Sequence, residues 1–274
     1  MMRAASRESY SVAVTRLEEY VRGAEPPAVA TTGAELLAVA DLLRREVRLR
    51  RALSDPARAG EDRAGLLTGV LSGKIGGDPL DLLGTLVAGR WSVPSELLDA
   101  VERLGVQALL GSADLADELG EVEDELFRFG QVVAADPQLS NTLSDPIAPV
   151  AQRAELVGML LTGKARPVTV RLVEAALAGF GGRSFSAGLT RLVELAAERR
   201  DRQVAYVTVA APLTEDEERR LGDQLSTIYG RAVAVKFTVD PTILGGASVR
   251  VGSDLYDGTI LRRLNETRNA LAKR

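Results

Sequence analysis

The amino-acid sequence predicts an α+β protein that is predominantly α: an N-terminal helical bundle domain with an internal duplication, followed by a small β-α-β-β-α C-terminal domain. Apolar residues recur at steps of three and four through the first two hundred residues, which is the spacing of amphipathic helices. After residue 203 the segments become rich in β-branched residues with near alternation, which is typical of strands. An internal repeat indicates the duplication.

The helical spacing is clearest in residues 8–22, 34–53 and 114–134. In the first of these segments, Val14, Leu17 and Val21 lie on one face. In the last, six apolar residues alternate at steps of four and three: Leu115, Leu119, Val122, Leu126, Phe129 and Val133. We interpret this stripe as a face that packs in a bundle core. The alternative is the seam of a two-stranded coiled coil, which normally needs a longer run.

Residues 53–74 and 143–164 match each other at an ungapped shift of 90 residues. The ten identical positions in the first copy are Leu53, Ser54, Asp55, Pro56, Arg63, Ala64, Leu66, Leu71, Gly73 and Lys74. Chance explains so dense a match poorly. We infer a tandem duplication of a helical unit that covers roughly residues 33–111 and 114–201, with four helices expected in each copy.

The sequence therefore predicts three domains. Residues 1–111 hold an N-terminal helix and the first repeat, residues 112–202 hold the second repeat, and residues 203–274 form the small α/β domain. In this last part, strands are expected at 203–212, 232–240 and 247–253.

Two helices are expected in the C-terminal domain. The first has Thr214 as its N-cap and Glu217 at the capping-box position, and it runs to Tyr229. The second begins near Asp257 and places these residues on one face: Ile260, Leu264, Thr267 and Leu271.

The composition excludes several classes of function. With no cysteine and no histidine, the chain has no disulfide, no thiolate nucleophile, no Cys/His zinc site and no imidazole catalysis. The net charge of −4 argues against nucleic acid as a partner. There is no apolar run of about 18–20 residues and no secretory signal. We therefore expect a cytoplasmic protein that meets a membrane only through partners.

Two motifs invite a chemical interpretation that their spacing does not support. Gly73-Lys74 and Gly163-Lys164 resemble part of a phosphate-binding loop, but no Ser or Thr follows either lysine and the triplets follow helices. A glycine at a helix C-terminus explains them better. The acidic residues around Glu123 spread around a helix and are expected to face solvent. We expect no catalytic residue, no metal site and no cofactor.

The end of the sequence carries a specific pattern, GG-x-x-x-R-x-G followed by DG. It resembles the signature of the delta subunit of bacterial F-type ATP synthases and of its mitochondrial counterpart, the oligomycin-sensitivity-conferring protein. The positions that carry the resemblance are Asp240, Pro241, Leu244, Gly245, Gly246, Val249, Arg250, Gly252, Asp257, Gly258 and Leu264. Thr259 stands where the family commonly has Ser. The resemblance covers roughly residues 114–274, and the chain is longer than the family pattern by about one repeat.

The resemblance implies a non-catalytic subunit of the peripheral stalk at the cytoplasmic face of the cell membrane. The helical domain would receive the N-terminal helices of ATP synthase alpha subunits in a groove between helices, and the C-terminal domain would hold the C-terminus of the b-type stalk subunit. The residues expected at the groove are Val14, Leu17, Leu189 and Leu192. The duplication leaves open which repeat binds the alpha subunit.

Two alternatives remain at this point. An unrelated helical-repeat adaptor explains residues 1–201 equally well, but it leaves the C-terminal pattern without a cause. An enzyme that acts through Asp, Glu or Lys in a cleft between domains would need a carboxylate or lysine with a strongly shifted pKa in a pocket.

Overall fold

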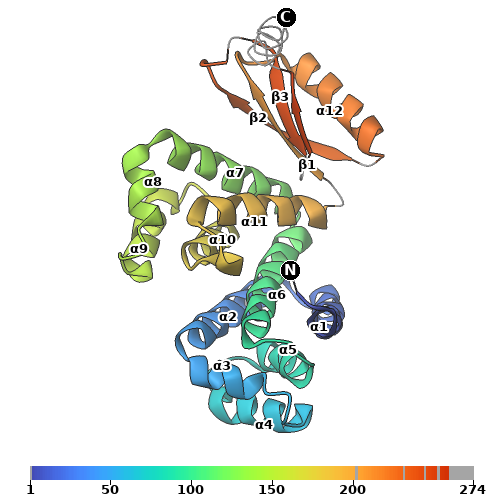
Figure 1. The fold of residues 1–274 in the computed structure, drawn as a ribbon, viewed down its shortest axis with the longest axis vertical. Helices are drawn as coiled ribbons and strands as arrows, with labels where there is room; N and C mark the ends of the chain where they lie inside the picture. The colour runs from blue at the N-terminus through green and yellow to red at the C-terminus, as the bar shows by residue number, and fades with distance from the viewer. Residues whose placement is uncertain (1, 201–202, 231, 244, 252–253, 259–274) are drawn as a thin grey trace, which may run out of the picture. The chain divides into compact units, whose positions relative to one another are not determined.

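The computed structural model describes residues 2–200, 203–230, 232–243, 245–251 and 254–258. The chain divides into two compact units, Met1–Leu192 and Val193–Arg274, and the boundary falls within α11. We call these the helical unit and the C-terminal unit. The helices, shown in Figure 1, are α1 (Ala4–Gly23), α2 (Pro26–Arg45), α3 (Val47–Leu53), α4 (Gly60–Leu71), α5 (Gly77–Ala88), α6 (Pro94–Leu115), α7 (Leu119–Ala135), α8 (Pro137–Ser144), α9 (Val150–Leu161), α10 (Pro167–Leu177) and α11 (Phe185–Arg199).

The helix boundaries repeat at a shift of 90 residues. α4 shifted by 90 coincides with α9 at both ends, and α5 and α10 begin at Gly77 and Pro167. The same shift carries α1 onto α6, so residues 4–199 contain two six-helix sets, α1–α6 and α6–α11, that share α6. The duplication inferred from the sequence therefore corresponds to a repeated structure.

Each repeat contains five helices, α2–α6 and α7–α11, and the expectation of four was wrong. The segment expected to form one helix over residues 34–53 is interrupted at Glu46, whose backbone (φ −95°, ψ 75°) is not helical. The apolar spacing continues across this break, which is why periodicity alone did not reveal it.

A similar break divides the predicted helix at 114–134. Leu115 ends α6 and is 42% exposed, Asp117 has a φ of 56°, and α7 begins only at Leu119. The remaining residues of the stripe are buried: Leu119, Val122, Leu126, Phe129 and Val133. The interpretation of the stripe as a core face is confirmed.

The triplets Ser72-Gly73-Lys74 and Thr162-Gly163-Lys164 follow the ends of α4 and α9. Gly73 and Gly163 adopt φ angles of 74° and 75°, in the left-handed region that glycine enters without steric cost. The N–H groups of the following lysines donate to the carbonyls of Leu71 and Leu161, each at 2.9 Å. These contacts satisfy carbonyls that the end of a helix leaves free, so the helix C-cap interpretation is confirmed.

A buried arginine serves the same purpose in each copy. The Arg63 guanidinium donates to the carbonyls of Ala88 (3.1 Å) and Gly89 (2.9 Å) at the end of α5. Its counterpart Arg153 donates to the carbonyl of Leu143 (2.8 Å) near the end of α8. A cation is favoured at a helix C-terminus, where carbonyl groups lack partners.

α2 and α6 cross where two glycines meet, and Figure 1 shows the two helices side by side. A Cβ atom added to Gly33 would lie 3.0 Å from the carbonyl oxygen of Gly105 and 2.9 Å from Cγ of Leu109. A Cβ added to Gly105 would lie 2.9 Å from Cγ of Leu37. Only residues without a side chain permit so close an approach of the two backbones.

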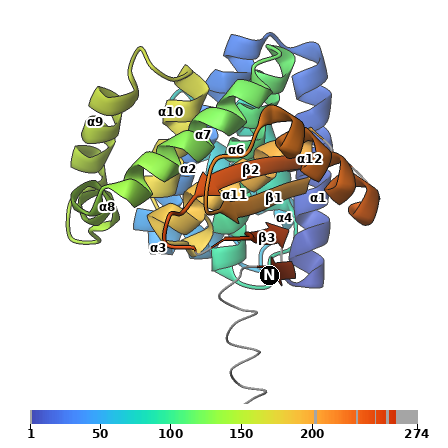
Figure 2. The same cartoon turned by 90° about the horizontal axis from the view of Figure 1, so that it is seen from above.

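The C-terminal unit contains β1 (Gln203–Val209), α12 (Glu215–Tyr229), β2 (Val233–Val239), β3 (Ala247–Val251) and β4 (Asp254–Asp257). The strand order is β2-β1-β3-β4, with β1 parallel to β2 and antiparallel to β3. α12 covers one face of this sheet (Figures 1 and 2), where Leu225 packs with Ala205 and Val251.

The sequence predicted three of these strands and the capping box of α12. Thr214 Oγ1 accepts the N–H of Glu217, and the Glu217 carboxylate accepts the N–H of Thr214. The fourth strand was not expected. The last helix was predicted to begin near Asp257, but Asp257 is the last residue of β4; the residues expected on its apolar face, Ile260, Leu264, Thr267 and Leu271, lie outside the described residues.

We expect Gly33→Ala to lower the free energy of unfolding by about 1–3 kcal/mol, because the added methyl group meets backbone atoms of α6 that have no space to move. Gly65→Ala in α4 is the matched control, since nothing lies within 4 Å of its Cβ position. It should stabilise by roughly 0.5–1 kcal/mol through helix propensity. Urea unfolding followed by circular dichroism measures both, and a Gly33→Ala protein as stable as the control would contradict the close packing.

Candidate functional site

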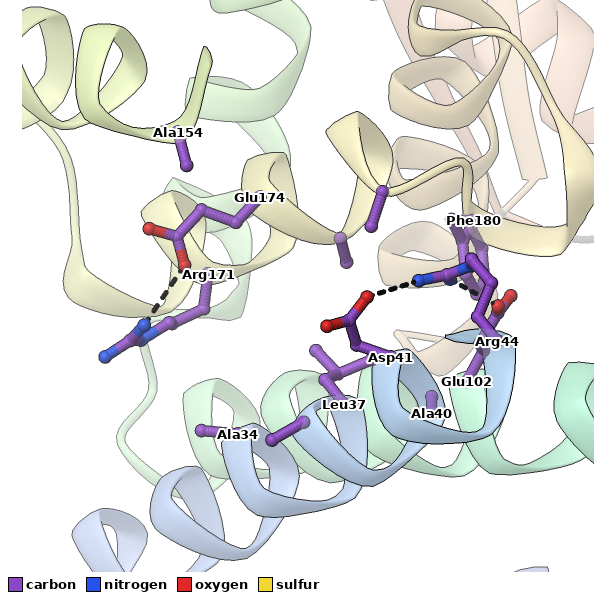
Figure 3. A pocket seen from close by; sticks show the side chains of 13 residues that line it. Ala34, Leu37, Ala40, Asp41, Arg44, Glu102, Ala154, Arg171, Glu174 and Phe180 are labelled. Atoms are coloured by element: carbon purple, nitrogen blue, oxygen red, sulfur yellow. Dashed lines mark hydrogen bonds and ion pairs between the residues drawn. The ribbon is translucent and has the colours of Figure 1, made fainter. Parts of the chain in front are cut away.

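A groove of about 340 Å³ lies between α2, α6 and α10. Its apolar lining includes Ala34, Leu37, Ala38, Ala40, Ala154, Ala175, Ala178 and Phe180. Figure 3 shows two charged clusters beside it: Asp41 and Arg44 with Glu102 at one side, and Arg171 with Glu174 at the other. α2 belongs to the first copy and α10 to the second, so the groove exists only because the two copies pack together.

Glu102 on α6 ties the two copies at this groove. Its carboxylate accepts from Arg44 on α2 at 2.6 Å and from the N–H of Gly181 at 2.8 Å. Gly181 reaches this position in a left-handed turn with a φ of 60°. Burial raises the pKa of Glu102, although the hydrogen bond from Gly181 and the charge of Arg44 oppose that rise. The carboxylate therefore has defined partners on both copies.

The first copy has no equivalent of this groove, because α2 has no counterpart 90 residues earlier in the chain. The 90-residue shift relates α6 and α10 to α1 and α5. Between α1 and α5, the exposed Arg16 Nε donates to Asp81 at 3.1 Å. An exposed ion pair contributes little to stability.

α1 is fixed at its N-terminal end by polar contacts to the start of α6. Glu96 accepts from Ser6 Oγ (2.6 Å) and from the N–H of Arg3 (3.1 Å). Ser9 Oγ accepts the N–H of Arg90 at 2.8 Å. Burial alone would raise the pKa of Glu96, and the two hydrogen bonds outweigh it, so that the pKa lies below its usual value. α1 is thus an ordered part of the helical unit.

The four predicted partner-binding residues do not line the groove. Leu17 and Leu192 are fully buried, Leu189 is 3% exposed, and Val14 is half-buried against the core. Their direct role in partner binding stays a prediction. Helical periodicity marks the inward face of a helix, whereas a partner reaches the outward face. Ala34 and Ala38, spaced four apart on α2, were the signal in the sequence that could have found the groove.

Four described residues of the C-terminal signature lie in the turn between β2 and β3: Asp240, Pro241, Gly245 and Gly246. Asp240 Oδ1 accepts from the N–H of Thr242 (2.9 Å) and from its hydroxyl (2.7 Å), and these bonds lower the pKa of Asp240. Gly245 and Gly246 have φ angles of 135° and 82°, which disfavour any residue with a side chain.

The rest of the signature supports the sheet. The Arg250 guanidinium on β3 lies over the ring of Tyr206 on β1, 4.6 Å from the ring centroid. Asp257 on β4 lies opposite Ser248 on β3 in the antiparallel register of the sheet. The N–H of Gly258 donates to the carbonyl of Ala247 at 2.9 Å. Gly252 lies outside the described residues. The described signature residues thus shape a turn and a sheet edge.

The described part of the chain contains no cluster of three or more Asp, Glu, His or Cys residues suited to a metal ion. Nor does any helix among these residues have the length and apolarity needed to cross a membrane.

Residues 106–271 match the family model of the ATP synthase delta (OSCP) subunit. The chain belongs to this family. An ATP synthase subunit delta from Salinispora arenicola is 77% identical over 274 residues, which cover both chains completely. One from Streptomyces griseus is 45% identical over 271 residues, covering 99% of this chain and all of that one. A chain of the Toxoplasma gondii mitochondrial ATP synthase hexamer matches more weakly, with 15% identity, 61% and 94% coverage and a TM-score of 0.37, and the assignment does not depend on it.

Membership of the delta (OSCP) family makes this chain a structural stator subunit of ATP synthase and not an enzyme, so the enzyme and the unrelated adaptor are both set aside. The match begins within α6, which places α1–α5 outside the family model. The Salinispora relative is matched over its whole length, so it shares the additional repeat.

We expect the stability of the folded chain to depend on the ionisation of Glu102. A carboxyl group with a raised pKa binds its proton more tightly in the folded state than in the unfolded state. Its contribution to the stability of the fold is therefore greatest below its pKa in the unfolded chain, and it is lost as pH rises through its pKa in the folded chain. Glu102→Gln keeps an acceptor for the Gly181 N–H but does not ionise. The unfolding free energy of the wild type should therefore fall relative to this variant as pH rises above the ordinary value of 4.5.

Chemical unfolding across a pH series measures this difference. Glu61→Gln, at an exposed position in α4, controls for the loss of one negative charge. Parallel pH profiles for wild type and Glu102→Gln would show that Glu102 has the same pKa in both states.

Proposed function

We propose that this chain is the peripheral-stalk subunit that links the alpha subunits of the catalytic head to the b-type stalk of an F-type ATP synthase, at the cytoplasmic face of the membrane. The observation that carries the proposal is family membership over residues 106–271. The chain would reach the membrane only through its partners. Its task is mechanical, because it prevents the head from turning with the rotor.

The groove between α2, α6 and α10 suits the N-terminal helix of an alpha subunit. An amphipathic helix binds by placing apolar residues at positions i, i+3, i+4 and i+7 into a groove. The lining of small apolar residues provides such a groove, because alanines let a helix approach closely. Asp41 and Arg44 are paired with each other at 3.2 Å, so the rim offers charges of both signs to a partner.

The C-terminal unit would hold the C-terminus of the b-type subunit. Two linked contacts raise the effective concentration of each site for its partner, so that neither contact has to be very tight. This arrangement fits a chain that holds two large bodies together and carries out no chemistry.

We expect Ala38→Phe to weaken binding of the N-terminal peptide of the cognate alpha subunit about tenfold or more, because the ring fills the groove that the peptide must enter. Ala38 is exposed on α2, so the substitution leaves the core intact. Ala28→Phe is the matched control, since Ala28 is also exposed on α2 but does not line the groove. Isothermal titration of the full-length chain measures both affinities.

Equal affinities for the two variants would show that the alpha peptide binds somewhere other than this groove. A tagged chain should also co-purify with alpha and b-type subunits from solubilised membranes. Recovery of neither subunit would refute the stator proposal itself.

A further inference from the structure

The first copy carries a cluster of arginines that the second copy lacks. Residues 44–51, at the end of α2 and the start of α3, contain five arginines and one glutamate. The equivalent residues 134–141 contain no basic residue and one aspartate. The helices have the same arrangement in both places, since α3 and α8 begin at Val47 and Pro137. The bend between α2 and α3 therefore does not require the arginines in order to fold.

Three of the five arginines have partners within the helical unit. Arg44 binds Asp41 and Glu102, Arg45 binds Asp41 at 2.6 Å, and Arg50 donates to the carbonyl of Leu43 at 3.1 Å.

Arg48 and Arg51 are exposed, and among the described residues neither forms an ion pair. They stand three apart on α3 and so share one face of the helix. This face presents two uncompensated positive charges on a chain whose net charge is −4.

A groove of about 350 Å³ adjoins this face. Arg51 lines it together with Pro56, Trp91, Val93 and Pro94. Trp91 is a core residue, 5% exposed, and its indole N–H donates to the carbonyl of Leu86 at 2.8 Å, so its position at the groove is fixed. The carboxylate of Asp55 also lines the groove, but it is engaged by the N–H of Ala57 (2.9 Å) and lies 3.7 Å from Arg58. The groove thus combines an apolar wall with a positive edge.

The second copy keeps Ser54, Asp55 and Pro56 of this groove's lining as Ser144, Asp145 and Pro146, but not the aromatic or the basic residue. Gly181 replaces Trp91 and Asn141 replaces Arg51 at the equivalent positions. Gly181 and the next glycine, Gly182, adopt left-handed φ angles of 60° and 69°. Trp91 and Arg51 therefore occur together in the first copy, and both are absent from the second.

We propose that the groove beside α3 binds an acidic peptide segment of a protein partner, with carboxylates on Arg48 and Arg51 and an apolar side chain against Pro56, Val93 and Pro94, next to Trp91. Charge complementarity selects the acidic partner. A concave apolar wall fits a peptide side chain better than a flat membrane surface. The site is separate from the groove between α2, α6 and α10, so it adds a third contact to the two of the proposed stator function.

Trp91 is the only tryptophan in the chain and therefore reports on this groove directly. The probe is the acetylated and amidated peptide EELEELEE, titrated into the full-length protein while Trp91 emission is recorded. A saturable change in emission is expected, and the lysine peptide KKLKKLKK should produce none. The same titration with phosphatidylglycerol vesicles tests whether the groove binds a membrane surface instead of a peptide.

The decisive variant is the double substitution Arg48→Gln and Arg51→Asn, which installs the residues that the second copy has at Gln138 and Asn141. Because those residues occupy the equivalent helix, the variant should fold, as circular dichroism would check. It should bind the acidic peptide about tenfold more weakly, since it removes two exposed ionic contacts.

Arg128→Gln, at a residue with a 75% exposed side chain on α7, is the matched control and should leave the affinity unchanged. Ala38→Phe should also leave it unchanged, which separates this site from the proposed alpha groove. Three results would overturn the proposal: no response to the acidic peptide, equal weakening by Arg128→Gln, or an emission change with vesicles and none with the peptide.

Discussion

The helical unit depends on the burial of α6 by helices from both copies. α2 crosses one face at Gly33 and Gly105, α1 is held at the start of α6 by Glu96, and α10 packs against it as well. Most residues of α6 are buried by these neighbours. α6 closes the first six-helix set and opens the second, so the two sets cannot separate without exposing it. The duplication has therefore produced one body with a shared element.

The repeated contacts separate what the fold requires from what the surface can change. In both copies a glutamate carboxylate, Glu35 or Glu125, accepts the backbone N–H of a residue 41 positions later, at 3.0 and 2.9 Å. The left-handed glycine recurs in the same way, whereas the buried arginine recurs with different carbonyl partners. Where the copies differ, the backbone can differ as well. Trp91 is a buried core residue of the first copy, whereas its counterpart Gly181 lies in a left-handed turn.

The sequence predicted the fold where local chemistry decides it. The repeat, the Gly73 and Gly163 caps, the Thr214 capping box and three strands all depend on residues close together in the chain. The break at Glu46 was missed because apolar spacing continues across it. The groove was missed because α2, α6 and α10 bring together residues more than a hundred positions apart. Leu17 and Leu192 were chosen from their periodicity, which identifies buried faces without showing what covers them.

A stator subunit needs stiffness more than chemistry, and the helical unit supplies it through packing. A protein interior is close-packed and transmits strain with little compression. The groove between the copies and the groove beside α3 both lie on the body that α6 holds together. Force applied at either would therefore be carried by the same shared helix. Contacts on one rigid body also strengthen each other, because the first contact holds the second partner nearby. A duplication that shares a helix thus adds surface to the helical bundle without adding a flexible joint.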